Sequence, residues 1–258
     1  MNLNGNTILI TGGSSGIGFE MAKEFLALKN KVIITGRNLD KLEKAKQKLG
    51  DVTIIQSDVS NPESIKELYE QVSKEFPAMN VLINNAGVMF TINLQKHDLS
   101  AYELTKELDI NVKGTIWMND IFLPLLKNNK NSATVTVSSG LAFVPLPISP
   151  IYCATKAAIH SYTLSLRGQL KNTDVKVFEL APPATETEML ADFNEEDMEG
   201  ISTMTVKAMV ADFLKGFSKN KFEICPGQSS QMKLMSRYFH GFILKQMSKT
   251  IDRMHANS

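Results

Sequence analysis

Short apolar runs recur along the chain and alternate with longer segments whose apolar residues repeat at helical spacing. Seven of the runs have the length of strands that are buried on both faces, and β-branched residues are frequent in them. These predicted strands cover residues 7–11, 31–35, 52–56, 79–83, 133–137, 175–180 and 221–224. The first run ends in glycines, which indicates a tight turn directly after that strand.

The segments between the runs predict helices. In the first segment, Phe19, Ala22 and Phe25 form one apolar face. Asn38 and Ser149 stand where the side chain of each can cap a following helix. The predicted helices cover residues 16–29, 39–49, 62–76, 100–126 and 150–170.

The alternation of strands and helices implies a parallel sheet with helices on both faces. We expect one doubly wound α/β domain of the Rossmann type over residues 1–227, with about seven strands and no internal repeat or linker. In such sheets, ligands bind outside the carboxyl ends of the strands. Residues 228–258 are expected to form a C-terminal extension.

Composition narrows the class of protein. Of 258 residues, 43% are hydrophobic and 21% are charged, as expected of a soluble globular protein. The formal net charge of +1 gives no support for nucleic-acid binding. Cys153 and Cys225 form neither a metal-ligand nor a redox motif and fit a reducing compartment. Because no signal peptide and no membrane-spanning run is evident, we predict a cytoplasmic protein without a metal site.

A glycine-rich turn joins the first predicted strand to the first helix. Glycines allow a sharp turn and a close approach to a pyrophosphate, and the helix N-terminus supplies amide donors. The turn contains Gly12, Ser14, Ser15, Gly16, Ile17 and Gly18. The spacing differs from the common dinucleotide fingerprint, so a plain turn is the alternative, but its place at the start of an α/β chain favours nucleotide binding.

Gly36 and Arg37 end the second predicted strand, where many NAD-binding domains carry an acidic residue for the ribose hydroxyl. A guanidinium can bind a 2′-phosphate through two hydrogen bonds, whereas a carboxylate would repel it. The nearest acid, Asp40, is better placed to complement a helix N-terminus. We therefore predict NADP(H) in preference to NAD(H).

Two asparagine motifs follow. Asn84 and Asn85 precede Ala86 and Gly87 at the end of the fourth strand, where amides can link neighbouring loops. A plain turn is the alternative there. Asn111 lies inside a long helical segment, a position that asparagine disfavours unless it is solvated or has a role.

Tyr152 and Lys156 are four residues apart on a predicted helix and share one face. A phenol beside an ammonium ionises more easily, which suits proton transfer to or from a carbonyl oxygen. Taken alone, the pair also fits an ordinary amphipathic helix. Ser138 and Ser139 follow the preceding strand.

Read together, these motifs resemble the one-domain branch of the short-chain dehydrogenase/reductase family over roughly residues 5–225. Asn111, Ser139, Tyr152 and Lys156 match its catalytic tetrad in order, and the spacing to Tyr152 favours Ser139 over Ser138.

The resemblance implies a role for each of these residues. Tyr152 would be the general acid or base, Lys156 would lower the pKa of Tyr152 and bind the nicotinamide ribose, Ser139 would orient the carbonyl, and Asn111 would hold a water that links Lys156 to solvent. Further cofactor contacts are implied for Asp58, Val59, Asn85, Ala86, Gly87, Pro182 and Thr187.

The chain departs from the family after the sixth strand, where Pro183 replaces a glycine. Proline fixes φ and removes an amide donor, so the loop that carries Thr187 is expected to run differently. Residues 184–205 would form the substrate lid, in which Phe193 and Met198 could cover the nicotinamide. An apolar wall is expected from Phe143, Val144, Leu146 and Pro147, although these residues could simply pack together.

The C-terminal extension is basic and amphipathic. Its apolar residues recur at helical spacing, with Lys233, Arg237, Lys245, Lys249 and Arg253 among them. Packing on the protein itself or on a second subunit is favoured, and peripheral membrane contact is the alternative.

The predicted function is reduction of a ketone or aldehyde, or oxidation of a secondary alcohol, by an NADP(H)-preferring oxidoreductase. The substrate would be partly apolar, and a homodimer or homotetramer is implied by the resemblance. Two alternatives stay open: a 3-ketoacyl carrier-protein reductase and a non-catalytic cofactor sensor.

Overall fold

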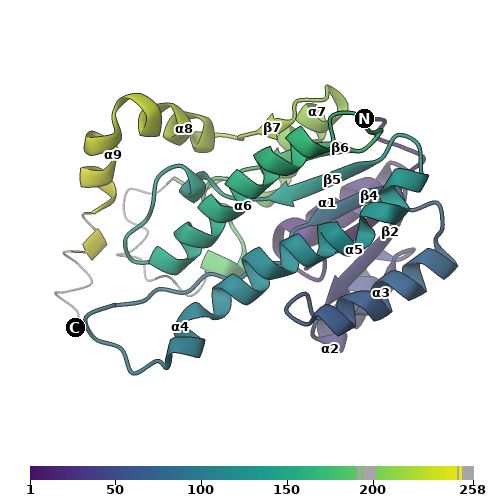
Figure 1. The fold of residues 1–258 in the computed structure, drawn as a ribbon, viewed down its shortest axis with the longest axis horizontal. Helices are drawn as coiled ribbons and strands as arrows, with labels where there is room; N and C mark the ends of the chain where they lie inside the picture. The colour runs from purple at the N-terminus through teal and green to yellow at the C-terminus, as the bar shows by residue number, and fades with distance from the viewer. Residues whose placement is uncertain (191–192, 194–201, 249, 252–258) are drawn as a thin grey trace.

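A computed structural model describes residues 1–190, 193, 202–248 and 250–251. In these residues, seven parallel strands form one sheet in the order β3-β2-β1-β4-β5-β6-β7 (Figure 1). The strands are β1 (Thr7–Thr11), β2 (Lys31–Gly36), β3 (Thr53–Gln56), β4 (Val81–Asn84), β5 (Ala133–Val137), β6 (Lys176–Leu180) and β7 (Glu223–Ile224). The predicted doubly wound α/β fold is confirmed.

Helices occupy most of the connections between the strands. They are α1 (Gly16–Ala27), α2 (Leu39–Leu49), α3 (Pro62–Glu75), α4 (Ala101–Glu107), α5 (Gly114–Asn128), α6 (Pro150–Gln169), α7 (Val206–Ser218), α8 (Gln228–Tyr238) and α9 (His240–Met247). Three short elements are the π-helical turn η1 (Leu108–Lys113) and the 3-10 turns η2 (Gly140–Ala142) and η3 (Glu188–Leu190).

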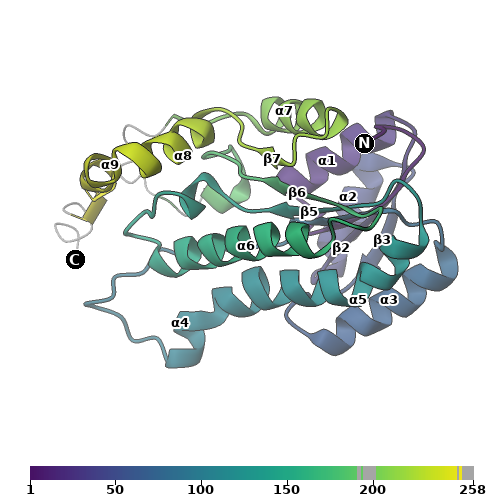
Figure 2. The same ribbon diagram turned by 45° about the horizontal axis from the view of Figure 1, so that its top comes forward.

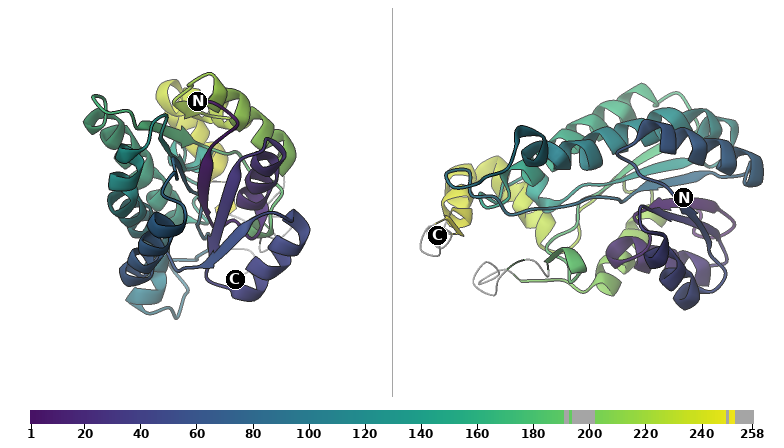
Figure 3. Two further views of the ribbon diagram at one scale, coloured as in Figure 1. Left: turned by 90° about the vertical axis from the view of Figure 1, so that its right-hand side faces the viewer. Right: turned by 90° about the horizontal axis from the view of Figure 1, so that it is seen from below.

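The helices cover both faces of the sheet and bury two apolar cores (Figures 2 and 3). On one face α1, α2 and α7 pack on the sheet, where Phe25 meets Phe213 and Phe217 edge to face. On the other face lie α3, α5 and α6. There the rings of Tyr69 and Phe122 meet edge to face, with their centres 5.3 Å apart. The strands between these layers are buried on both sides, which explains their continuous apolar sequences.

Helix caps follow the sequence in one of the two predicted cases. Asn38 accepts a hydrogen bond from the Lys41 amide at 2.9 Å and caps α2 as expected. Ser149 stands at the N-cap of α6, but it makes no capping bond, and its hydroxyl is buried without a partner among the described residues. The predicted cap at Ser149 is therefore wrong, and Pro150, which lacks an amide proton, starts that helix.

The long helical region predicted over residues 100–126 is present, although it is not one continuous α-helix. The π-helical turn η1 interrupts it and separates α4 from α5. Such turns insert an extra residue into a helix and are frequent at functional sites. This turn carries Asn111, so a residue that fits poorly inside an α-helix lies where the helix is irregular.

The C-terminal extension consists of two helices that break at Phe239. They project beyond the carboxyl ends of the strands, and α8 packs against η2 (Figure 1). Lys249 and Arg253 lie outside the described residues. No helix in the described part of the chain is long and apolar enough to cross a membrane.

The chain reverses its direction of travel across the sheet between β1 and β4. Strands β2 and β3 lie on one side of β1, and β4 to β7 on the other. The helices that follow β1 and β4 therefore lie on opposite faces of the sheet, which leaves a crevice at the carboxyl ends of these strands, where ligands bind in doubly wound sheets.

Candidate active site

A cavity of about 1090 Å³ opens at this crevice. Its lining includes nearly all the predicted site residues: Gly12, Ser14, Ser15, Gly16, Ile17, Arg37, Asp58, Val59, Asn85, Ala86, Gly87, Ser139, Tyr152, Lys156, Pro182 and Thr187. Asn111 and Gly18 lie behind the wall and support it. The fold thus brings together residues from the ends of six strands.

The glycine turn after β1 is braced by the loop after β4. The Asn85 amide donates to the carbonyls of Thr11 and Gly12, each at 3.0 Å. In return, the Thr11 hydroxyl accepts the backbone amides of Asn85 and Ala86, also at 3.0 Å. The predicted cross-link between loops is present for Asn85, whereas the Asn84 amide donates to the side chains of Asn119 on α5 and Thr134 on β5.

The turn fits a bound pyrophosphate. Gly12 has φ of +65°, and a Cβ there would come within 2.9 Å of Ala86, so the position requires glycine. Ser15 is the N-cap of α1, but its side chain makes no capping bond. The first amides of α1 therefore have no side-chain acceptor from Ser15 and can bind an anion.

Two cationic side chains lie at the end of β2. Arg37 is exposed, borders the cavity and makes no ion pair among the described residues. Lys41, on the first turn of α2, also borders the cavity and pairs with Glu188 at 3.2 Å. Lys41 was not predicted as a site residue from the sequence. The available signal was its position four residues after Arg37, at the start of the helix that follows β2.

The opposite wall carries the tyrosine and lysine of α6. Tyr152 and Lys156 are 6% and 4% exposed, and the Lys156 Nζ lies 5.4 Å from the centre of the Tyr152 ring. Lys156 donates to the Val137 carbonyl at 2.9 Å. These contacts hold both polar groups at the carboxyl end of β5.

The two serines after β5 face different partners. Ser138 donates to Glu179 at 2.6 Å. Ser139 interacts with the Tyr152 hydroxyl, and its oxygen accepts the Leu141 amide at 3.1 Å. The geometry therefore favours Ser139 as the serine that acts with Tyr152.

Burial raises the pKa of Tyr152 above its usual value, and the hydrogen bond with Ser139 only partly opposes this effect. The side chains of Cys153 and Glu107 raise it further. In the surroundings that the chain itself provides, desolvation of the phenolate therefore outweighs the decrease in pKa that is expected from Lys156. Tyr152 is held as the neutral phenol, which is the form that donates a proton.

Asn111 is fully buried and acts as a brace. Its side-chain oxygen accepts the Val88 amide at 2.9 Å, and its amide donates to Val88 at 2.9 Å and to Thr155 at 3.0 Å. A Cβ on Gly87 would lie 3.2 Å from this oxygen and 3.5 Å from the Lys156 Nζ. Asn111 thus stands beside Lys156 and fixes the loop after β4.

The proline-rich loop after β6 still reaches the cavity. Pro182 accepts the Gly140 amide at 2.8 Å, and Thr187 lies against Gly16, where a Cβ would meet it at 3.3 Å. Pro183 has no positive φ and lines the cavity as well. With proline at position 183, Thr187 lies against the glycine turn.

The region beyond Tyr152 is apolar. Met89, Leu146, Met189 and Phe193 surround it, together with Met247 from α9. Of the predicted wall, only Leu146 lines the cavity, and Phe143, Val144 and Pro147 do not. Of the predicted lid residues, Met198 lies outside the described part of the chain.

The C-terminal extension contributes to the same apolar region. Met232, Met235, Ile243 and Met247 line the cavity, so this face of α8 and α9 packs on the protein itself. Tyr238, Phe239 and Phe242 are exposed.

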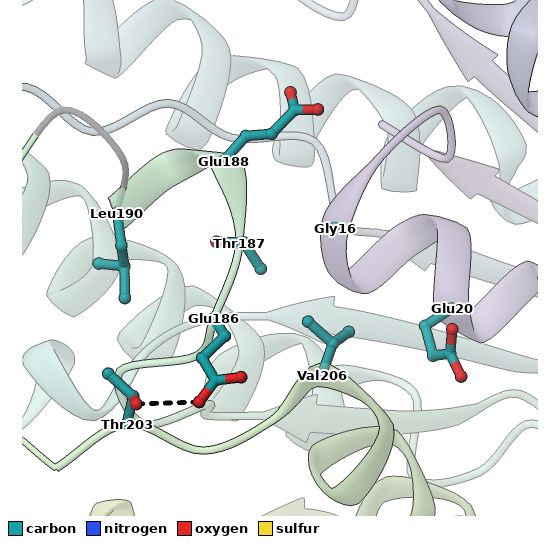
Figure 4. Close-up of a pocket in the computed structure, with 8 residues that line it drawn as sticks. All are labelled: Gly16, Glu20, Glu186, Thr187, Glu188, Leu190, Thr203 and Val206. Atoms are coloured by element: carbon teal, nitrogen blue, oxygen red, sulfur yellow. Dashed lines mark hydrogen bonds between the residues drawn. The ribbon is translucent and has the colours of Figure 1, made fainter.

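A depression of about 620 Å³ adjoins the cavity and shares Gly16, Thr187, Glu188 and Leu190 with its lining (Figure 4). Glu20, Glu186 and Glu188 line it, and Glu186 accepts a hydrogen bond from Thr203 at 3.1 Å. Three carboxylates would repel a pyrophosphate, so the depression does not compete for the cofactor. In the described residues, no cluster of three or more His, Cys, Asp or Glu side chains could hold a metal ion.

Comparison with known proteins decides the family. The family model described as short chain dehydrogenase matches residues 6–198. The chain belongs to the short-chain dehydrogenase family. This short-chain dehydrogenase is 38% identical over 250 residues to the "uncharacterized oxidoreductase DltE" of Bacillus subtilis, covering 96% of the chain and 98% of that protein. The "uncharacterized oxidoreductase SSP1627" of Staphylococcus saprophyticus is 32% identical over 202 residues, covering 77% of this chain and 81% of that protein.

Solved structures agree with this assignment. A short chain dehydrogenase from Burkholderia cenocepacia in complex with NADP superimposes with a TM-score of 0.83 and 24% identity, covering 96% of this chain and 99% of that one. A 3-ketoacyl-(acyl-carrier-protein) reductase from Brucella melitensis complexed with NADH superimposes with a TM-score of 0.76 and 27% identity, covering 84% of this chain and 91% of that one. The protein is an NAD(P)-dependent dehydrogenase or reductase.

Proposed function

We propose that this short-chain dehydrogenase prefers NADP(H) and transfers a hydride between the nicotinamide and a ketone, an aldehyde or a secondary alcohol. The observation that carries the proposal is the meeting of Ser139, Tyr152 and Lys156 on one wall of a cavity whose other end is the glycine turn. The proposal fits the cofactor because the amides of the first turn of α1 have no side-chain cap.

Each polar residue of the wall has a distinct role. Tyr152 donates its hydroxyl proton to the carbonyl oxygen in reduction and accepts it back in oxidation. Ser139 donates a hydrogen bond to the same oxygen and stabilises the negative charge that develops there. Lys156 supplies a positive charge beside the phenol, and Asn111 keeps the surrounding loop in place.

The cofactor would supply the hydride, and residues along the cavity would hold the cofactor. The glycine turn would bind the pyrophosphate, Asp58 and Val59 would border the adenine, and Lys156 would bind the nicotinamide ribose. Thr187, which lies beside Gly16, would contact the carboxamide of the nicotinamide.

The substrate is expected to be a partly apolar carbonyl compound. Beyond Tyr152 the cavity is lined by methionine, leucine and phenylalanine side chains. Methionine side chains are flexible and adapt to differently shaped apolar groups. A panel of ketones and aldehydes of increasing chain length, assayed by NADPH oxidation, tests this proposal, and failure to reduce any of them would refute it.

Arg37→Ala should weaken NADPH binding about tenfold, as expected for the loss of a charge-assisted hydrogen bond to the 2′-phosphate. Arg37 is exposed at the cavity edge, with Lys41 beside it. NADH affinity should hardly change, because that cofactor lacks the phosphate. Titration calorimetry with both cofactors measures the two dissociation constants.

Lys31→Ala is a matched control, because it removes one positive charge from the other end of β2. It should leave both affinities unchanged. If wild-type protein binds NADH and NADPH equally, the NADP(H) preference is wrong.

An alternative substrate is a 3-ketoacyl group on a carrier protein. The likeness to the Brucella melitensis reductase supports this alternative. Faster reduction of a 3-ketoacyl carrier protein than of the free thioester would favour it. Tight cofactor binding without turnover of any carbonyl would instead favour a cofactor sensor.

A homodimer or homotetramer is part of the proposal, with contact through the long helices α5 and α6. Leu164 on α6 is a large apolar residue that is 44% exposed, as expected of a side chain that a second subunit covers. Light scattering at micromolar concentration should give a mass at least twice that of one chain, and Leu164→Lys should lower it. A monomeric wild-type protein would contradict this prediction.

The proposed location is the cytoplasm, which is consistent with two free cysteines in the described residues. The exposed Tyr238, Phe239 and Phe242 keep peripheral membrane contact as an alternative use of the extension. Flotation with anionic liposomes distinguishes the two locations: protein that floats with the liposomes would favour membrane contact, and protein that stays behind would favour the cytoplasm.

A further inference from the structure

A carboxyl group lies buried behind the catalytic wall and has no part in the mechanism above. Glu107 ends α4 and is 1% exposed. One of its oxygens accepts the Phe90 amide at 2.9 Å, whereas the other is buried without a hydrogen-bond partner among the described residues. Burying an ionisable group in this way is costly, so the position calls for a physical explanation.

Glu107 and Asn111 are one helical turn apart and hold the same loop. Glu107 accepts the amide of Phe90, and Asn111 accepts the amide of Val88, two residues earlier. Gly87 begins this loop between the Asn111 side chain and the Lys156 Nζ. Glu107 and Lys156 are therefore two buried groups of opposite charge that neighbour the same loop.

The electrostatic surroundings of Lys156 contain few groups. Its Nζ meets the Val137 carbonyl and the Tyr152 ring. Lys156 makes no ion pair among the described residues, and the charge of Glu107 acts to raise its pKa. The field of Glu107 also reaches Tyr152 and Cys153 on the same helix.

The two groups oppose each other's desolvation. Burial lowers the pKa of Lys156 to about 8, and Glu107 counteracts this decrease. Burial raises the pKa of Glu107 to about 7, and the Phe90 amide and Lys156 counteract this increase. Each group therefore helps the other to remain charged between these two values.

We propose that Glu107 is a positioning residue whose ionised carboxylate is the counter-charge that keeps Lys156 an ammonium beside Tyr152. This inference rests on the proposed proton-transfer role of Tyr152 and Lys156. It assigns to Glu107 an effect on that chemistry through Lys156, without contact with substrate or cofactor. The protonated lysine is thereby retained at a pH where burial alone would neutralise it.

Glu107→Gln tests the charge and keeps the shape. Glutamine has the same length, and its amide oxygen can still accept the Phe90 amide. The alkaline decline of kcat/KM for carbonyl reduction should move down by about one pH unit. Below pH 7 the variant and the wild type should behave alike, because Glu107 itself is then protonated.

Glu103→Gln is the matched control. Glu103 lies one turn earlier on α4, is exposed, and forms the capping box with Ser100, a role that glutamine can also fill. This variant also loses one negative charge from the same helix, but it should leave the pH profile unchanged. Equal profiles for Glu107→Gln and the wild type would overturn the inference, even if the overall rate of the variant falls.

A second measurement follows Lys156 directly and needs no turnover. The NMR signals of ¹³C-labelled lysine side chains are recorded against pH, with Lys156 assigned from a Lys156→Met variant. The Lys156 midpoint should be lower by about one pH unit in Glu107→Gln. In the wild type, the same signal should show a smaller inflection near pH 7, where Glu107 ionises.

The two measurements separate the possible failures. If Lys156 titrates identically in both proteins and the wild type shows no inflection near pH 7, the inference about Glu107 is wrong. If the NMR shift is present but no carbonyl is reduced, the proposed function is wrong and the pairing of Glu107 with Lys156 stands.

Discussion

Tyr152→Phe should reduce kcat for carbonyl reduction by about 10³-fold, within the range expected for loss of a positioned general acid. The ring is buried among Met89, Leu146 and Cys153, and phenylalanine preserves that packing. The substitution removes the hydroxyl that interacts with Ser139 and donates the proton. Steady-state assays give kcat, and quenching of NADPH fluorescence should show that cofactor affinity changes little.

The direction of the Tyr152 pKa adds a second part to this prediction. Burial raises this pKa, so the phenol stays protonated through neutral pH and is ready to act as an acid. Reduction should therefore proceed at neutral pH, whereas oxidation, which needs the phenolate, should accelerate as the pH rises. The pH dependence of both directions with one ketone and alcohol pair measures this difference.

Tyr162→Phe is the control for Tyr152→Phe. Tyr162 lies on the same helix, α6, and is partly buried, with Asn119 as its partner. Loss of the Tyr162 hydroxyl should leave kcat unchanged within about a factor of two, because Tyr162 does not line the cavity. If Tyr152→Phe retains more than a tenth of the activity, another group supplies the proton.

The sequence predicts the sheet well because each buried strand is a short run of apolar residues with breakers at its end. Strand β1 has the predicted limits, and the glycine turn follows at its end. The edge strand β7 is shorter than predicted, Glu223–Ile224, because only one neighbouring strand defines it. Helix limits near turns depend on capping contacts, and Ser149 shows that a suitable residue need not make one.

That Ser139, Tyr152 and Lys156 line one cavity was also predictable, since such residues follow strands whose carboxyl ends meet at one edge of the sheet. The sequence could not show which polar side chains are buried in the interior. Glu107 occurs in a stretch with lysines and acids that resembles a solvated helix, and only the fold places it in the interior. Its position one turn before Asn111 was the available signal, because residues four apart share a helix face.

The C-terminal extension illustrates a second limit. Helical spacing indicated an apolar face but not its partner. The break at Phe239 turns α9 back toward the cavity, where Met247 packs beside Tyr152. Helical spacing alone does not reveal this break, so it could not identify the partner of the apolar face.

Gly18→Ala should weaken NADPH binding by at least tenfold and destabilise the protein by about 1–3 kcal/mol, the usual cost of overpacking. A Cβ on Gly18 would stand 2.4 Å from the Gly12 carbonyl oxygen and 2.5 Å from the Asn85 amide nitrogen. These two atoms are themselves joined by a hydrogen bond of 3.0 Å. Relief of the clash must therefore move α1 away from the turn that its amides complete.

Gly168→Ala provides the control for Gly18→Ala. Gly168 is exposed near the end of α6, and a Cβ there meets no atom within 4 Å. Alanine should stabilise this helix by about 0.5–1 kcal/mol and leave cofactor binding unchanged. Urea unfolding and calorimetric titration of both variants separate a general loss of stability from a displaced turn. If Gly18→Ala binds NADPH like the wild type, the amides of α1 do not hold the pyrophosphate, because the clash cannot be relieved without moving them.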